Sequence, residues 1–579
     1  MKKNKKGFTL IELLVTISLI AVLATITTIS VNGILNKSKS NASKIEESVV
    51  KSAGNEYIID NYNECKNGCV IPIDELKDYI ENFDNVRDKF VCVKVEVTGN
   101  KKTVNTSKSL SDCGIKENYP KLADGMIPVI YNDTNDVWEV ADISSKWYDY
   151  ENQWWANAVT VSDATYRTAE AGTPIPMDSI NTMWVWIPRF KYRIPNNIGS
   201  SSNVTEPPQI DVVFESGVQT TGISEKEYRN GITSSGTNAN YYTHPAFRNI
   251  SNIEYDESTT SRGAWDTEIT GFWVGKFETS IDESVTTDNS NTCYSKKDST
   301  NCNNSNLTPI IKPDVASLNY QNISNQFLTS LKFANGTMDT TTGEVTFIKN
   351  PNNIYGLNSK EATTDTHMMK NTEWGAVAIL SQSQYGKSGN TSYTIPNKEI
   401  YNNNSYNSTN NETYTGRSSG GPSENSTTYG TYSYNDKICT TTSPICIGEE
   451  SKYAGTGAST TGTIYGIYDM SGGLNEHTMG VWDNDKKSSG FSILPESKYY
   501  DLYRGTSSKS ISKEKSIMGD ATYETKKWYS DVDYFVYTNS PWINRGGYYS
   551  QNSIVGIINS NSSSGKELMN YSFRVTLIP

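Results

Sequence analysis

The sequence predicts an α+β protein in which a long N-terminal helix and a small β head precede a large β-rich outer domain. Three observations lead to this prediction. An apolar, helically spaced stretch occupies the first 62 residues, a segment dense in β-branched residues follows it, and all twelve tryptophans lie beyond residue 137. Because 579 residues exceed what a single compact core normally holds, we expect more than one domain.

Composition excludes one class of partner and favours an exported chain. The formal charge is -12, whereas a nucleic-acid surface needs clustered Lys and Arg, so we expect no nucleic-acid partner. Charged residues make up 20% of the chain and tyrosines number 37, a mixture typical of β-rich folds with polar loops outside the cell. The three histidines are far apart in sequence, which argues against a three-histidine metal site.

The eight cysteines favour disulfides over zinc, because their number is even, no Cys-x-x-Cys pair occurs and the chain reads as exported. Free thiols are the alternative. A disulfide from Cys293 to Cys302 and another from Cys439 to Cys446 would each close a short polar loop and limit its conformational entropy. The groups are Cys65 with Cys69, Cys92 and Cys113, then Cys293 with Cys302, then Cys439 with Cys446.

The chain begins with a lysine-rich leader, residues 1–7, followed by an apolar stretch, residues 8–31. At about 1.5 Å per residue this stretch can cross a membrane, and the lysines should keep the start cytoplasmic. An ordinary secretory signal is the alternative. Glu12 argues against it, since a carboxylate in an apolar segment costs about 2.5 to 3.5 kcal/mol on insertion scales. We therefore expect one N-terminal span with everything after it extracellular.

The segment Gly7-Phe8-Thr9-Leu10-Ile11-Glu12 resembles the cleavage and methylation motif of type IV prepilins and pseudopilins. The resemblance implies that a prepilin peptidase cuts after Gly7 and methylates the new amino terminus at Phe8. It also implies that Glu12 faces the terminal amine of a neighbouring pilin subunit during assembly. Physical chemistry agrees, because a buried charge is tolerated when it is paired.

We expect the anchor to continue as one amphipathic helix over residues 8–62, because apolar residues recur there at helical spacing. Its apolar face, which includes Ile45 and Val49, is expected to lie on a small sheet. Residues 63–117 are predicted to form a compact pilin head. A β-branched run at residues 90–97, followed by a Gly-Asn turn, should be one of its strands.

A linker is predicted at residues 118–124 and the outer domain at residues 125–579. Polar tracts such as residues 402–426 lack the hydrophobicity to fold alone and are expected to be surface insertions. The expected strands of the outer domain include residues 184–187, 272–278 and 572–577.

Several short segments of the outer domain occur in one order: Phe272–Glu278, Asn371–Trp374, Gly466–Glu476, Arg545–Tyr548 and Phe573–Val575. Together they resemble the formylglycine-generating-enzyme family, whose fold is a variant of the C-type lectin fold. The resemblance covers about residues 180–579, interrupted by insertions. The alternative is an unrelated β-rich surface domain.

The resemblance raises an enzymatic function, but the residues argue against it. Formylglycine formation in that family depends on two cysteines between the Arg-Gly-Gly motif and the terminal Phe-Arg, and this chain has none between Arg545 and Arg574. Another branch of the family uses a histidine-rich iron site, which three scattered histidines cannot build. We expect no catalysis, and an oxidoreductase of the formylglycine-generating type is the less favoured reading.

Recognition is the function that remains. Tyr and Trp give large, rigid contacts, and Asn and Ser adapt their hydrogen bonds, so the C-terminal tract suits an unknown extracellular ligand, protein or glycan. The tract also resembles the variable region of retroelement-diversified lectin-fold proteins. Solvated turn residues are the alternative. With Arg545 held inward, the expected contact face comprises Trp542, Asn544, Tyr548, Tyr549, Gln551 and Asn552.

The resemblance also implies a calcium ion at the turn from Asp469 to Glu476. These two residues would bind it by side chain, and Gly472 and Leu474 by backbone carbonyl. Oxygen ligands on a tight glycine-containing turn suit calcium. A turn held by hydrogen bonds alone is the alternative.

We therefore expect a type IV pilus-associated minor or tip pilin that displays a non-catalytic, lectin-like domain for adhesion or ligand recognition. A minor or tip position is favoured because so large an outer domain would crowd every position of a helical fibre. The alternative is a pseudopilin of a type II-like secretion or DNA-uptake system.

Overall fold

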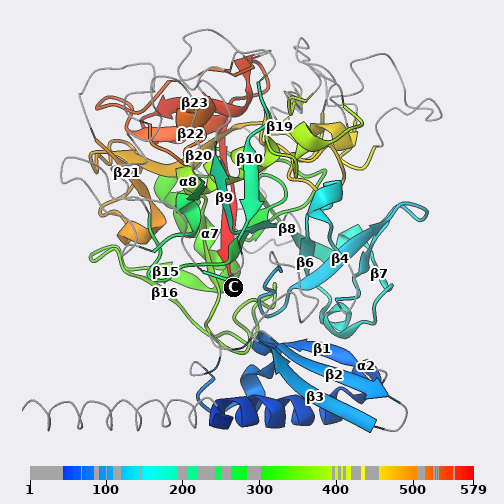
Figure 1. Cartoon of the computed structure of the whole chain (residues 1–579). Coiled ribbons are helices and arrows are strands. Elements are labelled where there is room, and N and C mark those ends of the chain that lie inside the picture. The colour runs from blue at the N-terminus through cyan, green and yellow to red at the C-terminus, as the bar shows by residue number, and fades with distance from the viewer. Residues whose placement is uncertain are drawn as a thin grey trace, which may run out of the picture. The chain divides into compact units, whose positions relative to one another are not determined.

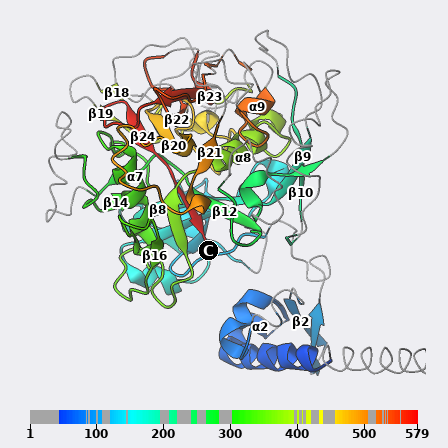
Figure 2. The ribbon, with the colours of Figure 1, turned by 90° about the vertical axis from the view of Figure 1, so that its left-hand side faces the viewer.

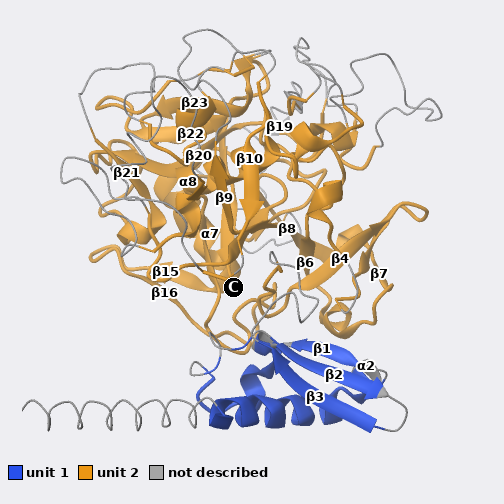
Figure 3. Ribbon diagram, viewed as in Figure 1, with its two compact units in different colours: residues 1–117 blue, residues 118–579 orange. Residues whose placement is uncertain are grey.

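The computed structural model has two compact units, residues 1–117 and 118–579 (Figure 3). Each unit is described by itself. The described residues are 44–66, 68–83, 86, 90, 92–98, 101–107, 119–143, 147–193, 207–215, 217–218, 241–249, 263–282, 302–393, 398–401, 406–407, 412–418, 432–436, 455–504, 516–525, 528–529, 531–532, 534–551 and 554–579.

The first unit is a helix packed on a three-stranded antiparallel sheet of order β1-β2-β3. The helix covers residues 44–60, and its inward side includes Val50 and Ala53. Gly54 allows the close approach, because a Cβ there would lie 2.8 Å from a methyl carbon of Val93 on β2. The remaining elements are α2 (Tyr62–Cys65), β1 (Cys69–Pro72), the 3-10 helix η1 (Ile73–Tyr79), β2 (Cys92–Thr98) and β3 (Lys101–Ser107).

The predicted strand at residues 90–97 is confirmed as β2. The predicted apolar face of the helix is only partly correct, because Ile45 and Val49 are exposed on the other side.

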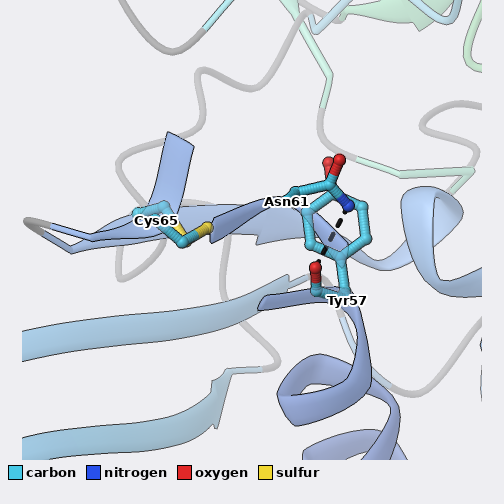
Figure 4. Close-up of a disulfide and its surroundings, with 4 residues drawn as sticks. Tyr57, Asn61 and Cys65 are labelled. Carbon is cyan, nitrogen blue, oxygen red and sulfur yellow. Dashed lines mark hydrogen bonds between the residues drawn. A yellow bond between two sulfur atoms is a disulfide. The ribbon is translucent and has the colours of Figure 1, made fainter. Parts of the chain in front are cut away.

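A disulfide joins Cys65 at the end of α2 to Cys69 at the start of β1. Figure 4 shows it beside Asn61, whose backbone N–H donates to the carbonyl of Tyr57. Cys92 and Cys302 are also disulfide-bonded, which agrees with the expected oxidised state. The other four cysteines lie outside the described residues.

The second unit is built on an eight-stranded sheet of order β17-β25-β12-β8-β6-β4-β5-β7. Its strands β8, β6, β4 and β7 are labelled in Figure 1. Its middle strands are buried on both faces, and Trp186 of β8 lies opposite Trp273 of β12 with the ring centroids 5.3 Å apart. The strands are β17 (Asp365–Met368), β25 (Val575–Ile578), β12 (Gly271–Gly275), β8 (Ile180–Pro188), β6 (Asn157–Val161), β4 (Ile127–Asn132), β5 (Val137–Val140) and β7 (Pro174–Ile175).

A second sheet in this unit has the strand order β21-β20-β22-β23, and β24 also pairs with β20. Helix α8 (Asn371–Ser381) lies near it (Figure 2), and the amide of Asn371 donates to the hydroxyl of Tyr503 on β21. The strands are β20 (Asn475–Trp482), β21 (Asp501–Tyr503), β22 (Trp542–Gly546), β23 (Gly556–Ser563) and β24 (Tyr571–Phe573).

The other described elements of the second unit are short. A three-stranded sheet joins β10 (Asp211–Phe214), β9 (Phe190–Arg193) and β11 (Tyr242–Thr243), and two-stranded pairs join β13 (Ser280–Ile281) to β14 (Pro309–Ile310), β15 (Gly336–Met338) to β16 (Val345–Phe347) and β18 (Tyr406–Asn407) to β19 (Glu412–Thr413). The helices are α7 (Ile323–Leu331) and α9 (Thr522–Thr525).

The structure confirms a β-rich protein with few helices in its described part, and it refines the predicted strands. Residues 184–187 lie within β8, whereas the run 272–278 is a strand only as far as Gly275. The run 572–577 divides at Arg574, so that β24 joins the second sheet and β25 the first.

Candidate functional site

Arg574 joins the two sheets of the second unit at the point where the chain passes from β24 to β25. Its guanidinium contacts both carboxylate oxygens of Glu476 on β20, with Nε to Oε2 at 3.0 Å and Nη2 to Oε1 at 2.5 Å. It also donates to the carbonyls of Gly275, at 2.7 Å, and Tyr468, at 2.9 Å. The side chain is fully buried, so this is an internal ion pair and not a surface one.

Two more buried carboxylates lie close to this ion pair. Oε1 of Glu278 accepts the backbone N–H of Leu474 at 2.9 Å. Burial raises the pKa of Glu278 well above its ordinary value, and the nearby Glu476 and Asp469 raise it further. Burial therefore disfavours the charged form of Glu278, and Arg574 is the cation that contacts the neighbouring Glu476 carboxylate.

The structure places both side chains predicted to bind calcium on other partners. Both carboxylate oxygens of Glu476 are on Arg574, and both oxygens of Asp469 accept the backbone N–H of Gly416, at 2.9 and 3.0 Å. The N–H of Gly472 donates to the carbonyl of Gly546. In the part of the chain that is described, no group of three or more His, Cys, Asp or Glu could hold a metal ion.

The structure corrects two residues of the predicted contact face. Trp542 is fully buried and Asn544 is 1% exposed, so neither can meet a ligand at the surface. Both residues lie on β22, an inner strand between β20 and β23 on which every residue is buried, because other segments of the unit cover the faces of the strand. The Trp542 ring stacks on Phe491 with the centroids 5.8 Å apart, and Gly565 packs closely against it.

The remaining described part of that face is a loop that follows β22. Gly546 and Gly547 have φ of 80° and 70°, which glycine adopts without strain, and they turn the chain sharply. Tyr548, Tyr549 and Gln551 are then partly exposed, and the two tyrosine rings meet edge to face at 5.5 Å. The Gln551 side chain accepts the N–H of Tyr548 at 3.1 Å, which holds the loop closed. Asn552 lies outside the described residues.

This tyrosine loop (residues 546–551) is tied to the turn predicted to bind calcium. The N–H of Tyr549 donates to the carbonyl of Gly473 at 3.0 Å, and the N–H of Gly472 donates to Gly546. The tyrosine loop and the turn are therefore joined by two backbone hydrogen bonds, and Glu476 at the end of the turn is paired with the buried Arg574. The loop presents aromatic and amide groups from a rigid base, an arrangement suited to binding.

Arg545 points inward, as predicted. It is fully buried, donates to the hydroxyl of Thr522 and to the carbonyl of Ile557, and lies 5.8 Å from the Trp374 ring centroid. Trp374 itself donates to the same carbonyl at 2.7 Å. Arg545 and Trp374 therefore belong to the buried residues that support the tyrosine loop, which we call the frame.

A buried charge network at the start of α8 was not predicted from the sequence. His367 lies between Asp365, at 2.9 Å, and Glu373, at 3.1 Å, and Lys370 is 3.5 Å from Glu373. Burial alone would lower the pKa of His367, but the two carboxylates overcome it and raise the pKa to about 9. The same neighbours outweigh burial at Glu373 and lower its pKa to about 2. The side chains of His367, Lys370 and Glu373 are all fully buried, so this network lies inside the unit.

The residues predicted for processing and assembly, Gly7, Phe8 and Glu12, lie outside the described residues. So does the predicted span, residues 8–31. No helix among the described residues is long and apolar enough to cross a membrane.

Comparison with known proteins bears on that N-terminal segment. Residues 2–28 match the family model of the prokaryotic N-terminal methylation motif. A search of curated proteins found no match to the chain. The prepilin-type motif indicates a pilin-like or pseudopilin-like protein that is membrane-anchored and pilus-associated, and it is consistent with processing by a prepilin peptidase and assembly with other pilin subunits.

Proposed function

We propose that this chain is a minor or tip subunit of a type IV pilus and that its second unit is a non-catalytic binding domain. The observation that carries the proposal is the combination of a prepilin-type N-terminus with the tyrosine loop on a buried frame. The fold expected for that frame is lectin-like and related to formylglycine-generating enzymes. The absence of cysteine between Arg545 and Arg574 supports recognition over that chemistry.

The proposed contact face is the described remainder of the predicted one: Tyr548, Tyr549 and Gln551. A ligand here meets two aromatic rings already fixed against each other, so little side-chain entropy is lost on binding. The backbone of the tyrosine loop is fixed by a hydrogen bond to Gly473 and by another within the loop. An extracellular protein or glycan would use this face for adhesion.

Binding is tested with the full chain in detergent against arrays of glycans and of extracellular proteins. A variant with both Tyr548→Ala and Tyr549→Ala should lose the hits that the unmodified chain gives. The matched control is Tyr166→Ala, since Tyr166 is also partly exposed but lies on a separate 3-10 helix, Ala164–Thr168. Retention of all hits by the double variant would place the binding surface elsewhere.

Assembly is tested separately with Glu12→Ala, which should leave cleavage intact but reduce incorporation into pili. The reason is that the terminal amine of the neighbouring subunit loses its charged partner. Unchanged incorporation would contradict the pilin part of the proposal and leave the binding part standing.

A further inference from the structure

Trp154 is the one tryptophan of the twelve that lies at the surface. It is 44% exposed, whereas each of the other eleven is 5% exposed or less, and all twelve fall within the described residues. An indole gains much from leaving water, so an exposed one is a favourable place for a ligand to cover. Trp154 therefore offers an aromatic contact that the tyrosine loop does not use.

The Trp154 ring is supported on one side by Tyr465. The two ring centroids are 5.5 Å apart and the ring planes meet at 32°. Tyr465 is itself buried and fixed, because its hydroxyl accepts the backbone N–H of Tyr131 at 3.3 Å and its ring meets Trp138 edge to face at 5.9 Å. The exposed side of the indole is thus backed by a buried aromatic layer.

The turn that carries Trp154 is braced by two distant segments. Asp149 and Trp154 exchange backbone hydrogen bonds at 2.7 and 2.9 Å, and Gln153 between them has a φ of 57°. The Gln153 side chain donates to the carbonyl of Gln384 at 2.9 Å, and the Gln153 carbonyl accepts the hydroxyl of Thr463 at 3.0 Å. The ring is therefore in place before a ligand arrives, and binding orders little of the backbone.

The residues around this turn are polar. Glu151 and Gln384 are exposed and Thr463 is partly exposed. Burial raises the pKa of Tyr465 to about 12 and the charge of Asp133 contributes, so the exposed Asp133 lies near the same ring. None of the exposed large apolar residues of the described part belongs to residues 149–153, to position 384 or to position 463. The indole is therefore a single aromatic surface among hydrogen-bonding groups.

Such a surface suits a neutral sugar. A pyranose whose ring hydroxyls are all equatorial presents C–H groups on both faces, which pack on an aromatic ring, and hydroxyls around its edge. The core of a protein interface would gather several apolar side chains, and an acidic sugar would be repelled by Glu151 and Asp133. We propose that Trp154 is a subsite for a β-linked glucose or N-acetylglucosamine unit, stacked on the exposed side of the indole with its hydroxyls at Gln384 and Thr463.

This subsite uses none of the residues of the tyrosine loop, so it adds to the proposed function and either can fail without the other. A single subsite of this kind binds at about millimolar concentration, which is too weak to survive the washing of an array. Binding is therefore measured in solution, with the full chain in a polyoxyethylene detergent that carries no sugar. The probes are cellotetraose and chitotetraose. Sorbitol, an open-chain polyol, and tetramethylammonium serve as comparisons.

Acrylamide quenching of tryptophan fluorescence observes the site directly, because only Trp154 is exposed to the quencher. Trp154→Phe should remove the readily quenched fraction of the emission. Cellotetraose or chitotetraose should protect that fraction in the unmodified chain, and sorbitol should not. Stronger protection by chitotetraose supports N-acetylglucosamine, and stronger protection by cellotetraose supports glucose.

Saturation-transfer NMR then measures the affinity of the variants. Trp154→Ala should weaken binding of the better oligosaccharide about tenfold or more, the effect expected of a central aromatic contact, and Trp154→Phe should keep part of the affinity. The matched control is Tyr534→Ala, because Tyr534 is 41% exposed on another segment of the second unit. It should leave the affinity unchanged, as should the double variant Tyr548→Ala and Tyr549→Ala.

Four results would overturn the proposal. One is equal acrylamide quenching of Trp154→Phe and the unmodified chain. Another is no protection and no binding by either oligosaccharide when cooperative unfolding shows that the chain is folded. The third is binding of sorbitol or tetramethylammonium as tight as that of the oligosaccharides. The fourth is a loss of affinity in Trp154→Ala no larger than in Tyr534→Ala.

Discussion

Replacing Arg574 with Met should destabilise the second unit by several kcal/mol. The guanidinium is fully buried and makes two contacts to Glu476 and two to backbone carbonyls. Removing one partner of a buried ion pair typically costs about 3 to 5 kcal/mol, because the other charge stays buried without compensation. The two carbonyls lose their donor as well, which adds to the cost. We therefore expect a loss of about 4 kcal/mol or more in the free energy of unfolding.

The chain provides a matched control in Arg193→Met. Arg193 also pairs with a carboxylate, at 2.6 Å from Asp211, but the side chains are 40% and 29% exposed. Exposed pairs contribute about 1 kcal/mol or less, so this variant should differ little from the unmodified chain. Adding Glu476→Gln to Arg574→Met should recover part of the loss, since a neutral amide replaces the stranded carboxylate.

Urea unfolding followed by tryptophan fluorescence is the assay. All twelve tryptophans lie beyond residue 137, so the emission reports the second unit and not the first. The reasoning is refuted if Arg574→Met costs no more than Arg193→Met. It is also refuted if the added Glu476→Gln makes the Arg574→Met variant less stable.

Three further predictions concern pH, calcium and the tyrosine loop. The pKa of His367 is raised from its ordinary value of 6.5 to about 9, so the charged imidazole contributes its full stabilisation below pH 6.5 and this stabilisation is lost as pH rises through about 9. The free energy of unfolding should therefore fall by about 3 kcal/mol across that range, and His367→Gln should flatten the fall. Because Arg574 engages Glu476, neither calcium nor chelator should change the melting temperature, and a calcium-dependent rise would restore the predicted metal site. Trp542→Ala should cost about 3 to 5 kcal/mol, whereas Tyr548→Ala should leave stability nearly unchanged; equal losses in denaturant unfolding would contradict the division between frame and loop.

Local signals in the sequence predict part of this architecture. The strand at residues 184–187 follows from its density of bulky apolar residues, and Phe573 and Trp374 are fully buried as their chemistry suggests. The inward position of Arg545 follows from two adjacent glycines that turn the chain just after it. These features depend on residues close together in the chain.

Features set by distant residues could not be predicted in the same way. Trp542 and Asn544 resemble surface residues of a polar tract, but side chains from distant segments cover β22, and Phe491 stacks on the Trp542 ring. Glu476 and Arg574 are 98 positions apart, so no local pattern shows that the two side chains form an ion pair.

Mass spectrometry of the mature amino terminus, on chain recovered from sheared pili, tests the central claim most directly. The prepilin-type motif at residues 2–28 predicts a chain that begins at Phe8 and carries a methylated terminal amine. A bulky replacement of Gly7 should leave the leader attached. Recovery of the chain in pili with this modified terminus would support the account. A terminus that begins after a later small residue, such as Ala21 or Ala24, would contradict it.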